Sequence, residues 1–219
     1  MTMGHQTCGK RKERQMKKVT LEEVKHLALN VKSRLYRKAN GLGRDPKIYL
    51  HWTAGRYNTL YEDYHINIKG DGSIFVSTDD FSEVLNHTWE RNTGSIGVTL
   101  CCGYGAGSKG LGDYPPTPVQ IEAMAQVIAV LCDALGLTIS KQNVLTHGEA
   151  ANNEDGLHVH EPYAWWNDSY GDGDTRGDLE YLGTPESPSY NPEATDGSRG
   201  GDVLRGKAIW YQNYWREHE

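Results

Sequence analysis

Two histidines directly follow short runs of β-prone, apolar residues. His51 ends the run 48–51, and His147 comes after the run 144–146. A strand terminus is a rigid place for a metal ligand, and a hydrolytic zinc site needs three histidine or carboxylate ligands with a fourth position open to water. A single histidine at a strand end is more often a hydrogen-bonded surface group. The pair therefore predicts a zinc site only where a third ligand joins it.

The segments that must position these histidines include two helices. Thr20 and Glu23 form a capping-box pair, and apolar residues then recur at three- and four-residue spacing to about residue 37. Thr117, followed by proline at the first helical position, opens a second and more apolar helix that Gly136 ends. The expected strands are 48–51, 64–69, 73–77, 95–101 and 144–146, with the second and third joined as a hairpin through Gly70-Asp71-Gly72.

Composition narrows the class of protein. The 219 residues carry a formal net charge of −6, which disfavours nucleic acid as the main partner because phosphate contacts require a basic surface. No apolar stretch approaches the roughly 18 residues of a spanning helix, so membrane insertion is not expected. The four cysteines include the adjacent pair Cys101 and Cys102, whose side chains would point to opposite faces of a strand. The sequence therefore predicts no disulfide framework.

Five short motifs follow one another along the chain. They are His51-Trp-Thr-Ala-Gly55, Tyr64-His-Ile-Asn-Ile68 with Gly70-Asp-Gly72, Asn92-Thr-Gly-Ser-Ile-Gly97, Thr146-His147 and Thr175-Arg-Gly-Asp178. In this order they resemble the type 2 N-acetylmuramoyl-L-alanine amidases, and the same order occurs in the peptidoglycan recognition proteins. The resemblance covers about residues 46 to 182. It implies an α/β fold with a mixed central β-sheet flanked by helices.

Three regions are expected in the chain. They are a basic N-terminal tail over 1–19, a zinc amidase catalytic domain over 20–183 that includes the N-terminal helix, and a C-terminal wrap over 184–219 that is rich in Pro, Ser and Gly. A chain of this length has room for one good core. The irregular, polar stretch 152–178 is expected to be functional, because long loops inside compact domains usually are.

The resemblance implies Zn²⁺ as cofactor and names its ligands. Family members bind zinc through a histidine in the first motif, a histidine after the late strand, and an aspartate or cysteine near the end of the domain. These positions map onto His51, His147 and Asp178. Four more residues compete with Asp178 for the place of third ligand: His158 and His160, which lie closer in sequence to His147, and Asp172 and Asp174.

Two catalytic groups are implied in the same way. Tyr64 matches the catalytic tyrosine of the family and is expected to orient and polarise the attacking water, whereas the strand position that often carries glutamate is Thr99 here. Arg176 stands where family members often carry a lysine that stabilises the oxyanion. Arginine keeps the positive charge but presents it as a planar fork.

Trp52, His87 and Asn92 are expected to contact the substrate. His87 belongs to a stretch that resembles the groove lining of the family, and a tryptophan such as Trp52 can stack on a sugar ring. Glu149 has two interpretations that stay open: a hydrogen-bond partner that supports the nearby ligand, or a solvated acid.

The implied activity is zinc-dependent hydrolysis of the amide between N-acetylmuramic acid and L-alanine in peptidoglycan or a muropeptide, by a monomer. Two further classes stay open: a non-catalytic peptidoglycan-binding module and a zinc hydrolase of a different cell-wall amide. The basic run from Lys10 to Lys18 precedes a capped helix and does not match a secretory signal. The chain therefore fits a phage or prophage endolysin that is made in the cytoplasm and released to the wall, and a cytoplasmic recycling amidase is the competing role.

Overall fold

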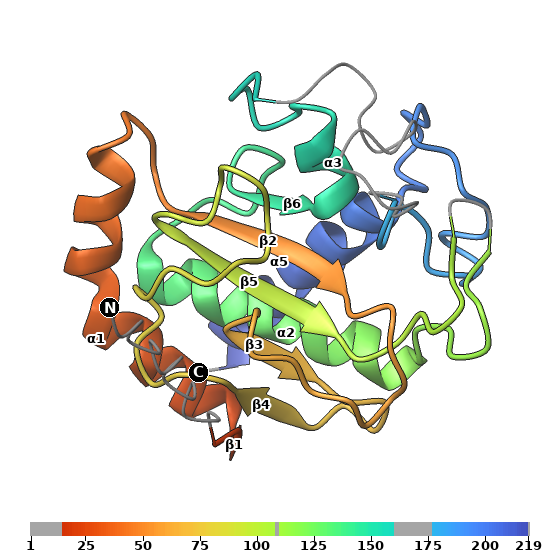
Figure 1. The fold of residues 1–219 in the computed structure, drawn as a ribbon, viewed down its shortest axis with the longest axis horizontal. Helices are drawn as coiled ribbons and strands as arrows, with labels where there is room; N and C mark the ends of the chain where they lie inside the picture. The colour runs from red at the N-terminus through yellow and green to blue at the C-terminus, as the bar shows by residue number, and fades with distance from the viewer. Residues whose placement is uncertain (1–14, 108–109, 160–176, 219) are drawn as a thin grey trace, which may run out of the picture.

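One six-stranded mixed β-sheet forms the centre of the protein. The computed structural model describes residues 15–107, 110–159 and 177–218, whose arrangement is shown in Figure 1. The strands are β1 (Lys17–Val19), β2 (Lys47–Trp52), β3 (Ile66–Ile68), β4 (Ile74–Val76), β5 (Ser95–Leu100) and β6 (Val144–Thr146). Their order in the sheet is β1-β4-β3-β5-β2-β6. β3, β5, β2 and β6 run parallel, and β4 pairs antiparallel with β1 and β3.

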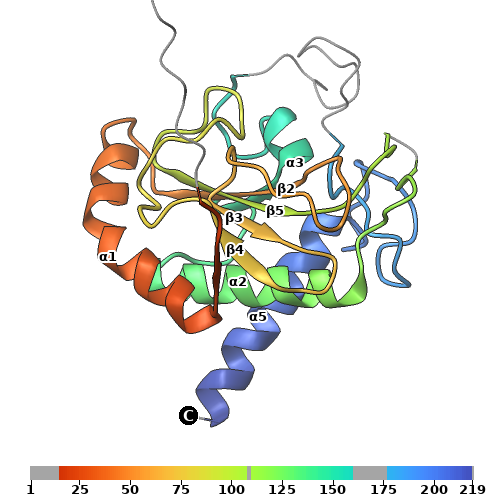
Figure 2. The ribbon, with the colours of Figure 1, turned by 60° about the horizontal axis from the view of Figure 1, so that its bottom comes forward.

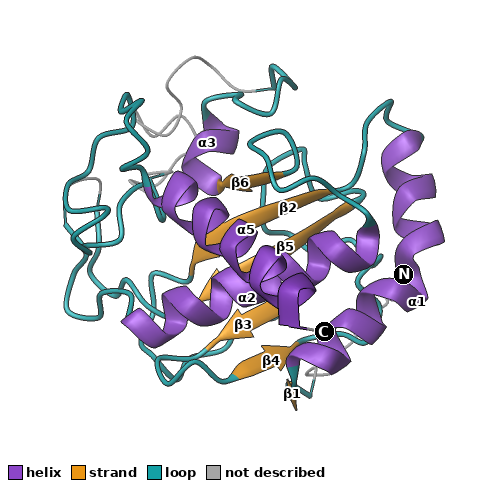
Figure 3. Ribbon diagram, turned by 180° about the vertical axis from the view of Figure 1, so that it is seen from behind, coloured by secondary structure: helices purple, strands orange, loops and turns teal. Residues whose placement is uncertain are grey.

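Helices cover this sheet and confirm the predicted α/β class. They are α1 (Leu21–Asn40), α2 (Pro118–Leu135), α3 (His147–Ala151) and α5 (Gly200–His218). α2 packs against the sheet and against both α1 and α5. In Figure 2, α1, α2 and α5 lie on one side of the sheet and the short α3 lies on the other. Figure 3 shows the helical side from behind, with α5 beside α2.

Capping and apolar periodicity account for the two long helices that the sequence predicts. The backbone N–H of Thr20 donates to the Glu23 carboxylate at 2.8 Å, and the Glu23 N–H donates back to the Thr20 hydroxyl at 3.2 Å. α2 begins after Thr117 with the same reciprocal pattern and ends at Gly136, whose φ is 74°. By length and composition α2 could cross a membrane, but 72% of it is buried inside the domain, which is typical of a core helix.

The central strands are buried along their whole length. All six residues of β2 and all six of β5 are buried, because α2 covers one face of the sheet and loops with α3 cover the other. Leu50, Val98 and Met124 belong to the same apolar cluster. The sheet therefore holds the ends of its strands rigidly, and one of those ends carries His51.

Two segments depart from the expected organisation. The predicted tail 1–19 ends in a strand, because Lys18 of β1 pairs with Phe75 of β4 at the sheet edge. The predicted wrap contains α5, which the sequence pattern does not reveal as a helix. A side chain at Gly200 would collide with the backbone of Leu179, so glycine permits α5 to start close to that segment.

Three of the four cysteines lie in the part of the chain that the structure describes. Cys101, Cys102 and Cys132 are free and buried. Burial raises the pKa of the Cys132 thiol to about 12, so this group stays protonated and behaves as a small apolar side chain. Cys8 and most of the basic run lie outside the described residues.

Candidate metal centre

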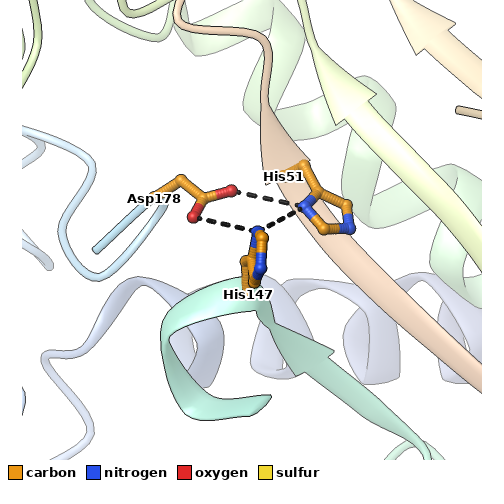
Figure 4. Close-up of side chains that lie close together, drawn as sticks. All are labelled: His51, His147 and Asp178. Atoms are coloured by element: carbon orange, nitrogen blue, oxygen red, sulfur yellow. Dashed lines mark hydrogen bonds and ion pairs between the residues drawn. The ribbon is translucent and has the colours of Figure 1, made fainter. Parts of the chain in front are cut away.

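The two predicted histidine ligands lie side by side because their strands are parallel neighbours. β2 and β6 pair with Leu50 opposite Thr146, so His51 and His147 follow at the same edge of the sheet. Asp178, from the segment before α5, completes the group (Figure 4). The two Nδ1 atoms of the histidines are 3.1 Å apart, and the Asp178 oxygens lie 3.4 Å from the Nδ1 of His51 and 3.5 Å from that of His147.

The donor atoms of these three side chains fit a zinc ion. With metal–ligand bonds of about 2.0–2.2 Å, the ligand atoms of a tetrahedral site lie roughly 3.3–3.6 Å apart. The two imidazole nitrogens are 3.1 Å apart, one Asp178 oxygen lies 3.4 Å from the Nδ1 of His51, and the other Asp178 oxygen lies 3.5 Å from the Nδ1 of His147. Each of these separations is close to this range, with the carboxylate facing the two histidines through one oxygen each. Two imidazole nitrogens and one carboxylate oxygen are also the ligand types of a catalytic zinc centre, which keeps its fourth position for water. Among the residues that the structure describes, no second group of three such side chains meets the same spacing.

Asp178 is held as a buried carboxylate. Burial acts to raise its pKa, but the charges and hydrogen bonds of His147 and His51 outweigh burial and hold the pKa well below its usual range. The backbone N–H of Trp52 donates to the Asp178 carboxylate at 3.4 Å. The next residue, Leu179, has a φ of 62°, a left-handed conformation that costs about 1–2 kcal/mol for a residue with a side chain. The packing around this turn therefore aims Asp178 at the two histidines.

The residues that compete with Asp178 as third ligand fall into two groups. His158 is exposed, and it does not belong to the cluster formed by His51, His147 and Asp178. His160, Asp172 and Asp174 lie outside the described residues.

Tyr64 lies against the candidate metal centre. The centroid of its ring is 5.1 Å from that of His51, at an interplanar angle of 48°, and the side chain is half-buried. The ring of Tyr64 therefore packs beside one of the three candidate ligands. The second predicted catalytic residue, Arg176, lies outside the described residues. The catalytic roles of both residues stay predictions.

His87 is placed behind His51 rather than in an open groove. It is 5% exposed, and its Nδ1 lies 2.9 Å from the Thr88 hydroxyl, which lies 3.3 Å from the Nε2 of His51. On its other side, the Nε2 of His87 lies 3.4 Å from the Ser95 hydroxyl. Burial and the neighbouring imidazoles lower the pKa of His87 well below its ordinary value, so its ring is neutral.

Asn92 and Trp52 are also predicted to contact the substrate. In the described fold, Asn92 holds a loop by hydrogen bonds and Trp52 packs in the apolar core. The side-chain oxygen of Asn92 accepts the backbone N–H groups of His87 and Thr88 at 3.0 and 2.8 Å, which fixes the loop that carries them. The indole of Trp52 is 7% exposed and belongs to the main apolar cluster. His87 and Trp52 are thus both buried in the described fold, and their contact with a substrate, like that of Asn92, stays a prediction.

Glu149 is not the solvated acid that the sequence allowed. It is fully buried and accepts two hydrogen bonds from the Arg205 guanidinium, both at 2.8 Å. It also caps α3, because its carboxylate accepts the backbone N–H of Thr146 at 2.9 Å and its own N–H donates to the Thr146 hydroxyl at 3.1 Å. Since α3 begins at His147, this cap fixes the direction in which the ligand leaves the sheet.

A second buried ion pair supports Asp178 in the same way. The carboxylate of Glu180, two residues along from the ligand, lies 2.8 Å from the Arg199 guanidinium and accepts the Thr146 hydroxyl at 2.7 Å. The sequence pattern does not reveal Arg199 or Arg205 as supports of the site, because ion pairs between distant segments leave no spacing pattern. Thr146 followed three residues later by Glu149 is a capping-box pattern that would have revealed one side of this arrangement.

The fold and the three donor atoms define an α/β domain with a candidate metal centre at the ends of its parallel strands. The family model described as N-acetylmuramoyl-L-alanine amidase matches residues 43–158 of this chain. This is more than half of the 219 residues, and the chain belongs to that family. It is therefore a cell-wall amidase by family. The matched region includes His51, Tyr64 and His147 and ends before Asp178.

Two solved structures resemble parts of the chain. The endolysin N-acetylmuramoyl-L-alanine amidase LysCS from Clostridium intestinale URNW is 17% identical, over 47% of this chain and 68% of its own, with a TM-score of 0.35. The Ph2119 endolysin from the Thermus scotoductus MAT2119 bacteriophage Ph2119 is 18% identical, over 52% of this chain and 77% of its own, with a TM-score of 0.38. A comparison with curated proteins gives no match.

Proposed function

We propose that this protein is a zinc-dependent N-acetylmuramoyl-L-alanine amidase. It hydrolyses the amide between the lactyl group of N-acetylmuramic acid and the L-alanine of the peptidoglycan stem peptide. The observation that carries the proposal is the convergence of His51, His147 and Asp178, with donor atoms 3.1–3.5 Å apart at one edge of the sheet. Membership of the amidase family supports the same substrate.

His51, His147 and Asp178 would hold the zinc ion. When bound there, zinc supplies a Lewis acid that polarises the scissile carbonyl and makes a water molecule more acidic. The protein contributes a preformed donor set, because Asp178 is kept ionised by the two imidazoles and both histidines start from rigid strand ends. The low exposure of His51 and Asp178 also limits competition from bulk water.

Tyr64 and Arg176 complete the proposed machinery. Tyr64 orients the attacking water with its hydroxyl, and it supplies a proton toward the leaving amine of L-alanine. Its ring packs beside His51, which keeps the phenol near the bond that breaks. Arg176 stabilises the negative charge that develops on the carbonyl oxygen, since a guanidinium keeps its charge at every working pH.

The test is digestion of purified sacculi by the zinc-loaded protein, the chelated protein and the chelated protein after zinc is restored. Mass spectrometry of the released fragments should show stem peptides with a free N-terminal L-alanine in the first and third samples only. His26→Ala is a matched control, because His26 is an exposed histidine that pairs with Glu22 on α1. Equal release of these peptides by the chelated protein would disprove zinc dependence.

The same digest separates the competing function classes. A peptidoglycan-binding module would retain the protein on sacculi without any new amine. A hydrolase of a different amide would release fragments whose new N-terminus is not L-alanine. We also propose an endolysin-like role for the protein as a monomer acting on the intact wall. Faster turnover of soluble muropeptides than of intact sacculi would instead favour the recycling role.

A further inference from the structure

Behind His51, polar groups form a continuous hydrogen-bonded chain that ends on the backbone. The hydroxyl of Ser95 lies 2.8 Å from the carbonyl oxygen of Arg91 and 2.9 Å from that of Asn92. A carbonyl oxygen can only accept, so the Ser95 hydrogen is donated to this pair. The remaining lone pairs of the Ser95 oxygen therefore face the Nε2 of His87, 3.4 Å away, and accept its hydrogen.

This end point fixes the direction of every other hydrogen bond in the chain. His87 is buried, and its two ring nitrogens face the hydroxyls of Thr88 and Ser95 rather than a carboxylate that could pair with a charged ring, so the imidazole is neutral and has one ring hydrogen. With that hydrogen on Nε2, its Nδ1 must accept from the Thr88 hydroxyl at 2.9 Å. The Thr88 oxygen is then able to accept from the Nε2 of His51 at 3.3 Å. His51 therefore carries its hydrogen on Nε2 and its lone pair on Nδ1, the atom that faces His147 and Asp178.

We propose that Thr88 and His87 are positioning residues that set the tautomer and the ring orientation of His51 before any metal binds. The proposal rests on the proposed function of His51 as a zinc ligand. Partners that hydrogen-bond the second nitrogen of a ligand histidine typically change metal affinity by about 10–100-fold when removed. Here the partner is a hydroxyl whose own direction is dictated by two backbone carbonyls through His87 and Ser95.

Burial and packing make this chain hard to replace by water. Thr88 is 2% exposed, and Ser95 is fully buried. The ring of His87 lies so close to Gly97 of β5 that a Cβ there would approach it to 2.6 Å, so the ring cannot shift toward the sheet. The Thr88 hydroxyl, which can both accept and donate, therefore links His51 to His87 directly.

The test compares Thr88→Val, which keeps the shape and removes the hydroxyl, with Thr88→Ser, which keeps the hydroxyl. In metal-free protein labelled with ¹⁵N-histidine, long-range ¹⁵N–¹H spectra report the tautomer of His51 directly. We expect the Nε2–H form in the wild type and in Thr88→Ser, and a mixture of tautomers in Thr88→Val. Zinc affinity, measured by competition with a chromogenic chelator, should fall about 10–100-fold in Thr88→Val and stay near wild type in Thr88→Ser.

Both measurements are made without substrate, so they are independent of whether the protein cleaves peptidoglycan. If the wild type binds no zinc, the metal part of the proposed function fails, while the tautomer spectra still decide the positioning role. An Nε2–H tautomer of His51 and a wild-type zinc affinity in folded Thr88→Val would overturn the inference. Thermal unfolding of both variants identifies any loss that comes from misfolding alone.

Discussion

The two histidines of the candidate metal centre are supported by opposite kinds of chemistry. His51 is backed by neutral groups, Thr88 and His87, which belong to the region that the amidase family matches. His147 is backed by the buried ion pair of Glu149 and Arg205, and Arg205 comes from α5, outside that region. Neutral partners can select which ring nitrogen binds a metal, whereas the charged pair fixes where the helix that carries the ligand begins.

The charged support, the buried pair of Glu149 and Arg205, has the larger desolvation cost. Ion pairs that are removed from water cost desolvation energy, which their mutual attraction recovers only with good geometry and complete hydrogen bonding. Arg205 meets this condition, because it contacts both oxygens of Glu149 and also donates to the carbonyl of Val144. The C-terminal helix α5 thus helps to support the site, and it packs against the core helix α2.

The largest expected effect comes from removing a ligand. His51→Ala, His147→Ala and Asp178→Ala should each lower zinc content to near zero and reduce cleavage by on the order of 10³-fold or more, since a catalytic metal contributes several kcal/mol. Zinc content is measured by elemental analysis and cleavage by amine release from sacculi. His158→Ala is the matched control and should keep both. A wild-type zinc content in Asp178→Ala would transfer the third-ligand role to another residue.

The charged support is broken by Arg205→Met, which leaves Glu149 buried without its partner. We expect a loss of about 3–5 kcal/mol in the free energy of unfolding, measured by urea denaturation. Arg37→Met changes an exposed arginine of α1 and should stay within about 0.5 kcal/mol of wild type. The double variant with Glu149→Leu should recover part of the loss, because neither charge of the pair remains. A loss in Arg205→Met below about 1 kcal/mol would show that the pair is not a structural support.

Tyr64→Phe removes a hydroxyl from a ring that packs beside His51. It leaves the ion pairs Glu149–Arg205 and Glu180–Arg199 unchanged. The ring remains against His51, so zinc content should be unchanged, while the rate of amide cleavage falls about 10²-fold for loss of the hydroxyl. Single-turnover digestion with a soluble muropeptide measures this rate. A wild-type rate would assign the proton transfers to another group, and a loss of zinc would show that the phenol supports the ligands instead.

The sequence alone predicts the strands that carry the ligands better than it predicts the contacts that support those ligands. The ligand strands and α1 and α2 follow from local signals: apolar runs, capping boxes and helix-ending glycines. The pairing of Glu149 with Arg205 joins segments 56 residues apart and has no local signature. α5 escapes prediction because two glycines open it and aromatic residues obscure its apolar stripe. The burial of His87 was also unpredictable, since it depends on the loop that Asn92 closes.

The smallest expected effect is a change in stability at low pH. It involves Asp155, which holds Arg91 at the end of the hydrogen-bonded chain behind His51. The carbonyl of Arg91 accepts from Ser95, and the Arg91 side chain is held by Asp155 at 2.6 Å. Burial acts to raise the pKa of Asp155, but hydrogen bonds and charge from Arg91 outweigh burial and lower the pKa below its ordinary value of about 3.9. The carboxylate therefore contributes stability above about pH 4, and this contribution is lost as pH falls through the lower, folded-state pKa.

Urea denaturation at several pH values should show this contribution as the difference between wild type and Asp155→Asn. We expect the difference to be constant from about pH 5 to 7 and to shrink by on the order of 1 kcal/mol as the pH drops below about 4. Asp113→Asn is the control, because Asp113 is an exposed turn residue. A difference that grows in acid would mean that Asp155 is protonated in the fold, and the anchor of the chain behind His51 would then be a neutral hydrogen bond rather than an ion pair.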